Sequence, residues 1–174
     1  MSYKIESDFI HNGLRCVVIF QDMGHRCGYV GIQKNNCLYG KSCNDYLEIK
    51  KEDIEDYKIS GVFPLLGSIL DDDERIRIDT YFECHGGITY SGGGENSKYP
   101  VESDLWWFGF DCAHYDDGKD LDLALEYFPE MKEQITARRQ IEKMFPTYYF
   151  VKEREYVEMN CKTLAEQLKI LAGN

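Results

Sequence analysis

Short apolar runs and one alternating stretch lie in the first two thirds of the chain, and both patterns are typical of β-strands. Residues 14–20 and 26–32 are two such runs, and both contain β-branched side chains. The turn signal Asp22-Met-Gly-His lies between them, so the sequence predicts a β-hairpin. Gly28 and Gly31 lie inside the second strand, where the missing side chains allow a ligand or another backbone to approach closely.

The alternation is clearest over residues 75–90, and we expect one long strand there with His85 on its polar face. Residues 105–114 begin with the most aromatic run of the chain, which predicts a buried strand. The glycine-rich residues 91–97 join the two and predict a flexible loop or a lid. We therefore expect the two strands to pair antiparallel.

The last third of the chain changes to the spacing of helices. Residues 121–128 are rich in apolar side chains and end before Pro129, and residues 130–144 have the sparse apolar positions of a surface helix. The clearest helix comes last, where apolar side chains recur at intervals of three and four. These side chains are Val157, Cys161, Leu164, Leu168 and Leu171. Strands first and helices last predict an α+β fold, in which one domain over residues 1–174 packs C-terminal helices on an antiparallel sheet.

The formal net charge of −11 argues against a nucleic-acid-binding surface, because phosphate backbones repel an acidic protein. No run approaches the roughly 20 apolar residues of a membrane span, and the N-terminus lacks the apolar core of a signal peptide. We therefore expect a cytoplasmic protein that contacts neither nucleic acid nor a membrane. The seven cysteines form no Cys-X-X-Cys pair, so we expect them to be reduced and mostly buried. The oligomeric state stays open, with a homo-oligomer as one option.

Ionisable side chains gather directly after the aromatic strand, at the end of a rigid element where proteins often hold reacting groups. His114 lies in this group with Asp111 and Asp116. Pairing of the two strands would bring His85 close, and two imidazoles can act as acid and base near neutral pH. We therefore expect His85 and His114 to be catalytic, with Asp111 or Asp116 orienting one of them. The alternative is a pair of ordinary, half-exposed histidines.

Six further residues are expected to hold a ligand. The guanidinium of an arginine can pair with a phosphate, tyrosine rings can stack on a base, and glycines beside a histidine leave room for a ligand. The alternatives are an ion pair with a nearby aspartate for the arginine and core packing for the rings. The set is Arg26, Tyr29, Gly86, Gly87, Thr89 and Tyr90.

A metal site is the weaker interpretation of the same stretch. Cys112 and His114 would share one side of a strand, and Asp116 would add an oxygen ligand. This spacing matches no common ligand set, and residues 116–118 do not continue as a calcium loop. We therefore predict no metal and no cofactor, with Cys112 in the core and an acidic turn at residues 116–118.

Several motifs, taken as a set, resemble a family of small uncharacterised proteins carried mostly by bacteriophages and prophages. In that family His-Pro usually precedes Leu-Tyr-Gly, whereas this chain has Asn36-Cys37 there, so a histidine at that place is dispensable to any shared chemistry. The motifs are Arg26-Cys-Gly-Tyr-Val-Gly31, Leu38-Tyr-Gly-Lys41, His85-Gly-Gly-Ile-Thr-Tyr-Ser91, Trp106-Trp-Phe-Gly-Phe-Asp-Cys-Ala-His114 and Tyr156-Val-Glu with Leu164-Ala-Glu-Gln-Leu168.

The resemblance implies a phage accessory protein in the host cytoplasm, and proteins of that kind often bind or destroy nucleotide signals of bacterial defence. We therefore expect the protein to bind a phosphate-containing small molecule such as a cyclic nucleotide. In the enzymatic version it is a phosphodiesterase-like hydrolase that uses the histidine pair. Two alternatives stay open, namely a protein that only sequesters the ligand and an acidic inhibitor that binds a host protein.

Overall fold

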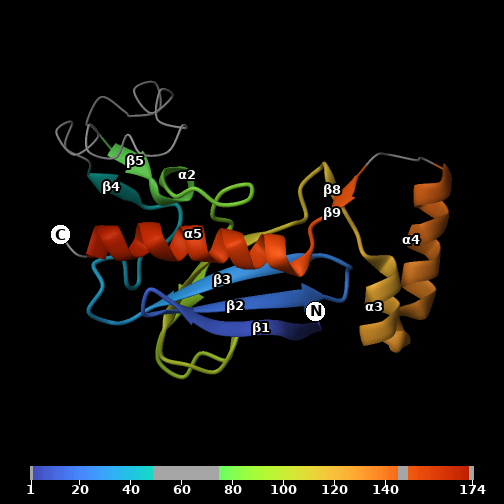
Figure 1. Cartoon of the computed structure of the whole chain (residues 1–174), viewed down its shortest axis with the longest axis horizontal. Coiled ribbons are helices and arrows are strands. Elements are labelled where there is room, and N and C mark those ends of the chain that lie inside the picture. Colours follow the sequence, from blue (N-terminus) through green and yellow to red (C-terminus); the bar gives the residue numbers. More distant parts are fainter. Residues whose placement is uncertain (1, 49–74, 145–148, 173–174) are drawn as a thin grey trace.

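A five-stranded antiparallel sheet forms the centre of the computed structural model, which describes residues 2–48, 75–144 and 149–172. The strands are arranged in the order β1-β2-β3-β7-β6 (Figure 1). Their bounds are Tyr3–His11 for β1, Leu14–Gln21 for β2, Arg26–Ile32 for β3, Tyr90–Gly93 for β6 and Trp106–Asp111 for β7. The most apolar strands, β2, β3 and β7, lie side by side in the middle, as their composition requires.

The predicted hairpin is confirmed, because β2 pairs antiparallel with β3 from Arg15↔Gly31 to Phe20↔Arg26. The aromatic strand is confirmed as β7, which pairs with β3 and lies almost completely buried. The edge strand β1 was not predicted, because its polar and apolar residues carry no clear alternation.

Helix α5, Arg154–Ala172, crosses one face of the sheet (Figure 1). The expected apolar stripe is the contact surface, since Val157, Cys161, Leu164 and Leu168 are fully buried against the sheet. A Cβ atom on Gly28 would lie 2.4 Å from the Phe110 ring and 2.7 Å from the Cys161 sulfur. This glycine therefore serves the approach of α5 and of β7 and not that of a ligand.

The opposite face of the sheet packs against the segment between β6 and β7. Tyr29 and Trp107 from the sheet form a second buried cluster with Val101, and Tyr90 and Tyr99 border it. The hydroxyls of Tyr29 and Tyr99 are hydrogen-bonded to each other. Both faces of the central strands are thus covered.

The remaining elements lie around this core. Helices α3, Leu121–Tyr127, and α4, Lys132–Met144, are joined by a 3-10 turn at Pro129–Met131 and lie beyond one end of the sheet (Figure 1). Two short pairs of strands complete the description: β4, Tyr46–Glu48, pairs antiparallel with β5, Arg75–Arg77, and β8, Asp117–Gly118, pairs parallel with β9, Phe150–Val151.

The single strand expected over residues 75–90 is wrong. Arg75–Arg77 is a strand, but Ile78–Tyr81 is one helical turn, α2, and the chain then turns at Gly86 and Gly87, whose φ angles are +67° and +82°. The buried apolar side chains that produced the alternation therefore point inward from different elements. Pairing with β7 is confirmed only for β6, with Tyr90 opposite Gly109, and the expected loop over residues 91–97 begins as part of that strand.

The architecture is α+β, as predicted, with C-terminal helices next to an antiparallel sheet. Over the described residues, no helix combines the length and apolar character that crossing a bilayer requires. All seven cysteines are free, and four of them are buried.

Candidate functional site

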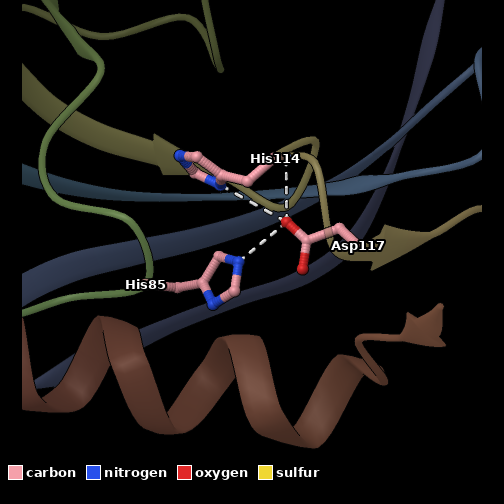
Figure 2. Close-up of side chains that lie close together, drawn as sticks. All are labelled: His85, His114 and Asp117. Atoms are coloured by element: carbon pink, nitrogen blue, oxygen red, sulfur yellow. Dashed lines mark hydrogen bonds and ion pairs between the residues drawn. The ribbon is translucent and has the colours of Figure 1, made fainter. Parts of the chain in front are cut away.

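Two histidines meet around one buried carboxylate. The rings of His85 and His114 lie 5.2 Å apart, measured between their centroids. Asp117 Oδ2 lies 2.8 Å from His85 Nε2 and 3.3 Å from His114 Nδ1, and it also accepts the backbone N–H of His114 at 2.9 Å (Figure 2). The expectation that the two imidazoles lie together is therefore met by the geometry, although they converge on Asp117 and not on Asp111 or Asp116.

The local chain path explains this arrangement. β7 ends at Asp111, and residues 112–116 turn the chain back so that Asp117 enters the short strand β8. Parallel pairing with β9 places Asp117 opposite Phe150 and next to the start of α5. His85 comes from the opposite side, out of the turn between α2 and β6 (Figure 2). Two separate segments thus supply the centre.

Gly86 is required by the position of the His114 ring. A Cβ atom on Gly86 would lie 2.0 Å from His114 Cε1 and 2.2 Å from His114 Nε2, far inside van der Waals contact. The φ angle of +67° also belongs to the left-handed region that glycine adopts most easily. The imidazole therefore lies directly against the backbone of the turn that carries His85.

Asp117 is ionised at the centre. Its side chain has no exposed surface, and burial alone would raise its pKa, but hydrogen bonds from His85 and from the His114 backbone lower the pKa below its ordinary value. Lys152 Nζ lies 3.5 Å from the other carboxylate oxygen, Oδ1, and supplies a positive charge. Oδ1 is buried and has no hydrogen bond.

The hydrogen bonds assign different roles to the two rings. An ionised carboxylate only accepts, so His85 Nε2 and His114 Nδ1 carry protons toward Asp117. His85 Nδ1 is engaged as well, at 3.0 Å from the Tyr156 hydroxyl on α5. His114 Nε2 makes no hydrogen bond to any described residue, and this side chain is 33% exposed compared with 12% for His85. His114 is therefore the ring that can reach a ligand with a free lone pair.

The two aspartates expected at the site lie elsewhere. Asp111 Oδ2 accepts a hydrogen bond from the Thr89 hydroxyl at 2.7 Å, and its Oδ1 accepts the N–H of Ala113 at 3.1 Å. Asp116 is exposed and makes no hydrogen bond to either imidazole. Asp117, which was interpreted as part of an acidic turn, is the carboxylate that the sequence reasoning missed. No local signal in the acidic run distinguishes it from Asp116.

Most residues expected to bind the ligand have structural partners. Arg26 forms a buried, two-pronged ion pair with Glu6, at 2.6 and 3.0 Å, and also donates to the Lys152 carbonyl, so its guanidinium is not available for a phosphate. Tyr29 and Tyr90 belong to the cluster on the far face of the sheet. Thr89 is held by Asp111. Gly86 and Gly87 alone adjoin the histidines.

Exposed aromatic rings lie on the segments next to the centre. Tyr115 follows His114 directly and is 87% exposed, and its ring makes an edge contact with Tyr149 at a centroid distance of 6.0 Å. Phe150 in β9 is exposed as well. Large aromatic side chains at such exposure are suited to stacking on a flat ligand. The sequence reasoning did not select them.

A separate surface hollow of about 450 Å³ contains none of the expected site residues. Tyr39 and Leu105 form its apolar part, and the polar part includes Lys34, Glu95 and Asp104. Lys34 and Glu95 form an exposed ion pair in this hollow, at 3.1 Å.

The expected alternative of a metal held by Cys112, His114 and Asp116 is wrong in its residues. Cys112 is buried in the core, and its pKa is raised by burial and by the charge of Asp117, so it stays a neutral thiol. The ligand atoms that do lie together belong to His85, His114 and Asp117, all within 4.8 Å of one another. The chemistry open to the centre is therefore proton transfer through His114 or coordination of a cation by the same three groups.

Comparison with protein-family models, with curated proteins and with solved structures finds no match to this chain.

Proposed function

We propose that the protein binds and hydrolyses a phosphate-containing small molecule of the cyclic nucleotide type at the centre formed by His85, His114 and Asp117. The observation that carries the proposal is a partly exposed imidazole with a free nitrogen, oriented by a buried, ionised carboxylate. This is the arrangement that activates water or a hydroxyl in many hydrolases.

His114 is the general base of the proposed reaction. A water molecule gives one proton to His114 Nε2 while its oxygen forms a bond to phosphorus, and the bond from phosphorus to the leaving oxygen breaks. The imidazolium that forms is stabilised by Asp117, which accepts from Nδ1. The proton required by the leaving oxygen comes from the Tyr156 hydroxyl, and the His114 imidazolium then returns a proton to the tyrosine oxygen through solvent. One water is consumed, and the diester becomes a monoester and an alcohol.

Positive charge for the phosphate comes from Lys152. Its ammonium group lies next to Asp117 and above the Tyr156 ring, 5.8 Å from the ring centroid, and the side chain is partly exposed. We assign the phosphate-binding role expected for Arg26 to this lysine, whose ammonium group lies 3.5 Å from Asp117 Oδ1. A compact ammonium group is a common partner of phosphate oxygens.

Two observations favour a nucleotide over other phosphate esters. Tyr115 offers an exposed ring next to His114, on which a nucleobase can stack. The net charge of −11 disfavours long nucleic acids, whereas a small ligand meets only the local field of the site. The resemblance to phage accessory proteins agrees with a signal molecule of bacterial defence as the substrate.

The proposal is tested by incubating the purified protein with a panel of cyclic mononucleotides and dinucleotides and analysing the products by chromatography. We expect one member to be converted to a linear product, and the His114→Ala variant to lose about 10²–10⁴-fold in rate, the usual contribution of a general base. His11→Ala is the matched control, because His11 also pairs with a carboxylate, Glu166 at 2.9 Å, but lies on the exposed edge of the sheet.

Full activity in His114→Ala would refute the proposed chemistry. Tight binding of a panel member with intact ligand recovered after denaturation would instead favour sequestration. Binding of no small molecule, together with a salt-sensitive complex with a host protein, would favour the acidic inhibitor.

A further inference from the structure

We infer that the His85, His114 and Asp117 centre binds one divalent transition-metal ion of the zinc class. The inference deepens the proposed function and rests on it for its catalytic consequence, whereas the binding itself rests on the geometry of three ligand atoms. His85 Nε2, His114 Nδ1 and Asp117 Oδ2 each lie within 4.8 Å of the other two.

The spacing of these atoms is that of a coordination shell. Tetrahedral zinc with bonds of about 2.0–2.1 Å holds its ligand atoms roughly 3.3 Å apart. Asp117 Oδ2 is 3.3 Å from His114 Nδ1 and 2.8 Å from His85 Nε2, so small rotations of the side chains would complete the shell. Two imidazoles and one carboxylate are also a donor set that zinc and its neighbours prefer.

A cation explains why both rings converge on one oxygen. Without it, a single oxygen of Asp117 accepts from two imidazoles and a backbone N–H, while the buried Oδ1 has no hydrogen bond. Two rings that point at the same oxygen face a common point between them (Figure 2). An ion at that point takes the place of the two shared protons.

The groups behind the ligands are those that a metal site requires. With His85 Nε2 on the metal, Nδ1–H donates to the Tyr156 hydroxyl at 3.0 Å, which fixes the orientation of the ring. Lys152 Nζ, 3.5 Å from Asp117 Oδ1, holds the distal carboxylate oxygen. Since the His114 side chain is 33% exposed, solvent can reach the centre, and a bound ion could take a water as a further ligand.

The consequence for the reaction concerns one step. A zinc-class ion lowers the pKa of its bound water to about 7, so that this water loses its proton to solvent before it attacks phosphorus. His114 then serves as a ligand, and the leaving oxygen still receives its proton from Tyr156. The bond that forms and the bond that breaks are unchanged.

The test uses the full chain after removal of metal with a chelator, titrated with Zn²⁺ by calorimetry and with Co²⁺ by visible absorption. We expect one ion per chain, the absorption of a nitrogen and oxygen ligand set without a thiolate band, and a rise in the melting temperature. His85→Ala and His114→Ala should each weaken binding at least 100-fold, and Tyr156→Phe about 10-fold, as for other groups behind a ligand. His11→Ala should bind as the parent does.

Absence of stoichiometric binding, or binding that survives in the His85→Ala, His114→Ala double variant with an unchanged melting temperature, would overturn the inference. Hydrolysis by the metal-free protein at full rate would overturn the catalytic role of the ion and leave the proposed function standing. A protein that binds the ion but hydrolyses no member of the nucleotide panel would support the metal inference and refute the proposed function.

Discussion

Substitution of Gly86 is the most specific test of the site, because one added methyl group displaces the His114 ring and leaves all three side chains of the centre chemically unchanged. In Gly86→Ala the new Cβ would lie 2.0 Å from His114 Cε1. The backbone of the turn cannot easily yield, whereas the partly exposed imidazole can rotate away. Rotation breaks the 3.3 Å contact of Nδ1 with Asp117 and moves Nε2 by more than an ångström.

The expected loss is large in activity and small in stability. Misplacing a reacting group by about 1 Å costs on the order of 10²-fold in rate. An alanine in the left-handed region costs about 1–2 kcal/mol in the free energy of unfolding. We therefore expect Gly86→Ala to fold, to melt a few degrees lower and to lose about 100-fold in kcat/KM.

Gly40→Ala is the matched control for backbone strain. Gly40 has a φ angle of +82°, and a Cβ atom there would meet nothing within 4 Å. Both variants should lose similar stability in urea unfolding, but only Gly86→Ala should change the imidazole proton resonances of His114 and the rate. Equal rates in the two variants would refute the reasoning that Gly86 positions His114.

Three further predictions use other parts of the structure. Burial, and after it the charge of Lys119, lowers the pKa of His25 from 6.5 to about 4. As the pH drops below 6.5 the unfolded chain binds a proton at this ring before the folded chain does, so the free energy of unfolding falls between pH 6.5 and 4. The decrease in the free energy of unfolding is at most about 3 kcal/mol because the ring is partly exposed. Urea unfolding of His25→Asn at several pH values checks this, and an equally steep decrease in the variant would contradict the account. Glu6→Gln leaves Arg26 buried without its charge partner and should cost about 3–5 kcal/mol of stability in urea unfolding, with ligand affinity unchanged if Arg26 is structural. Tyr115→Ala should weaken nucleotide binding in calorimetry about 10-fold without a change in melting temperature, and unchanged affinity would exclude Tyr115 from stacking.

The sequence alone predicted the elements whose apolar spacing follows from burial in the core. The β2–β3 hairpin, β7 and α5 follow from apolar spacing, since each buries a continuous run of side chains. Residues 75–90 show the limit of that reasoning, because side chains can point inward at alternating positions from a helical turn as well as from a strand.

The two histidines of the candidate site were predictable from the sequence, whereas its carboxylate was not. Three aspartates lie within seven positions, and only the path of the turn after β7 decides that the last of them faces the rings. Lys152 reaches Asp117 through the parallel pairing of β8 with β9, a contact between distant segments that leaves no local pattern. Arg26 carried the stronger local signal, but its partner Glu6 lies on an edge strand that the sequence did not predict.

The hydrogen bonds of His85 have a consequence for folding. One reaches Asp117, 32 positions along the chain, and the other reaches Tyr156 on α5, 71 positions along. Closing loops of this length costs entropy that only the nearly complete fold repays, so the centre assembles late. A bound ligand therefore stabilises the contacts between α5 and the middle of the chain. Amide hydrogen exchange throughout α5 should slow when the site is filled.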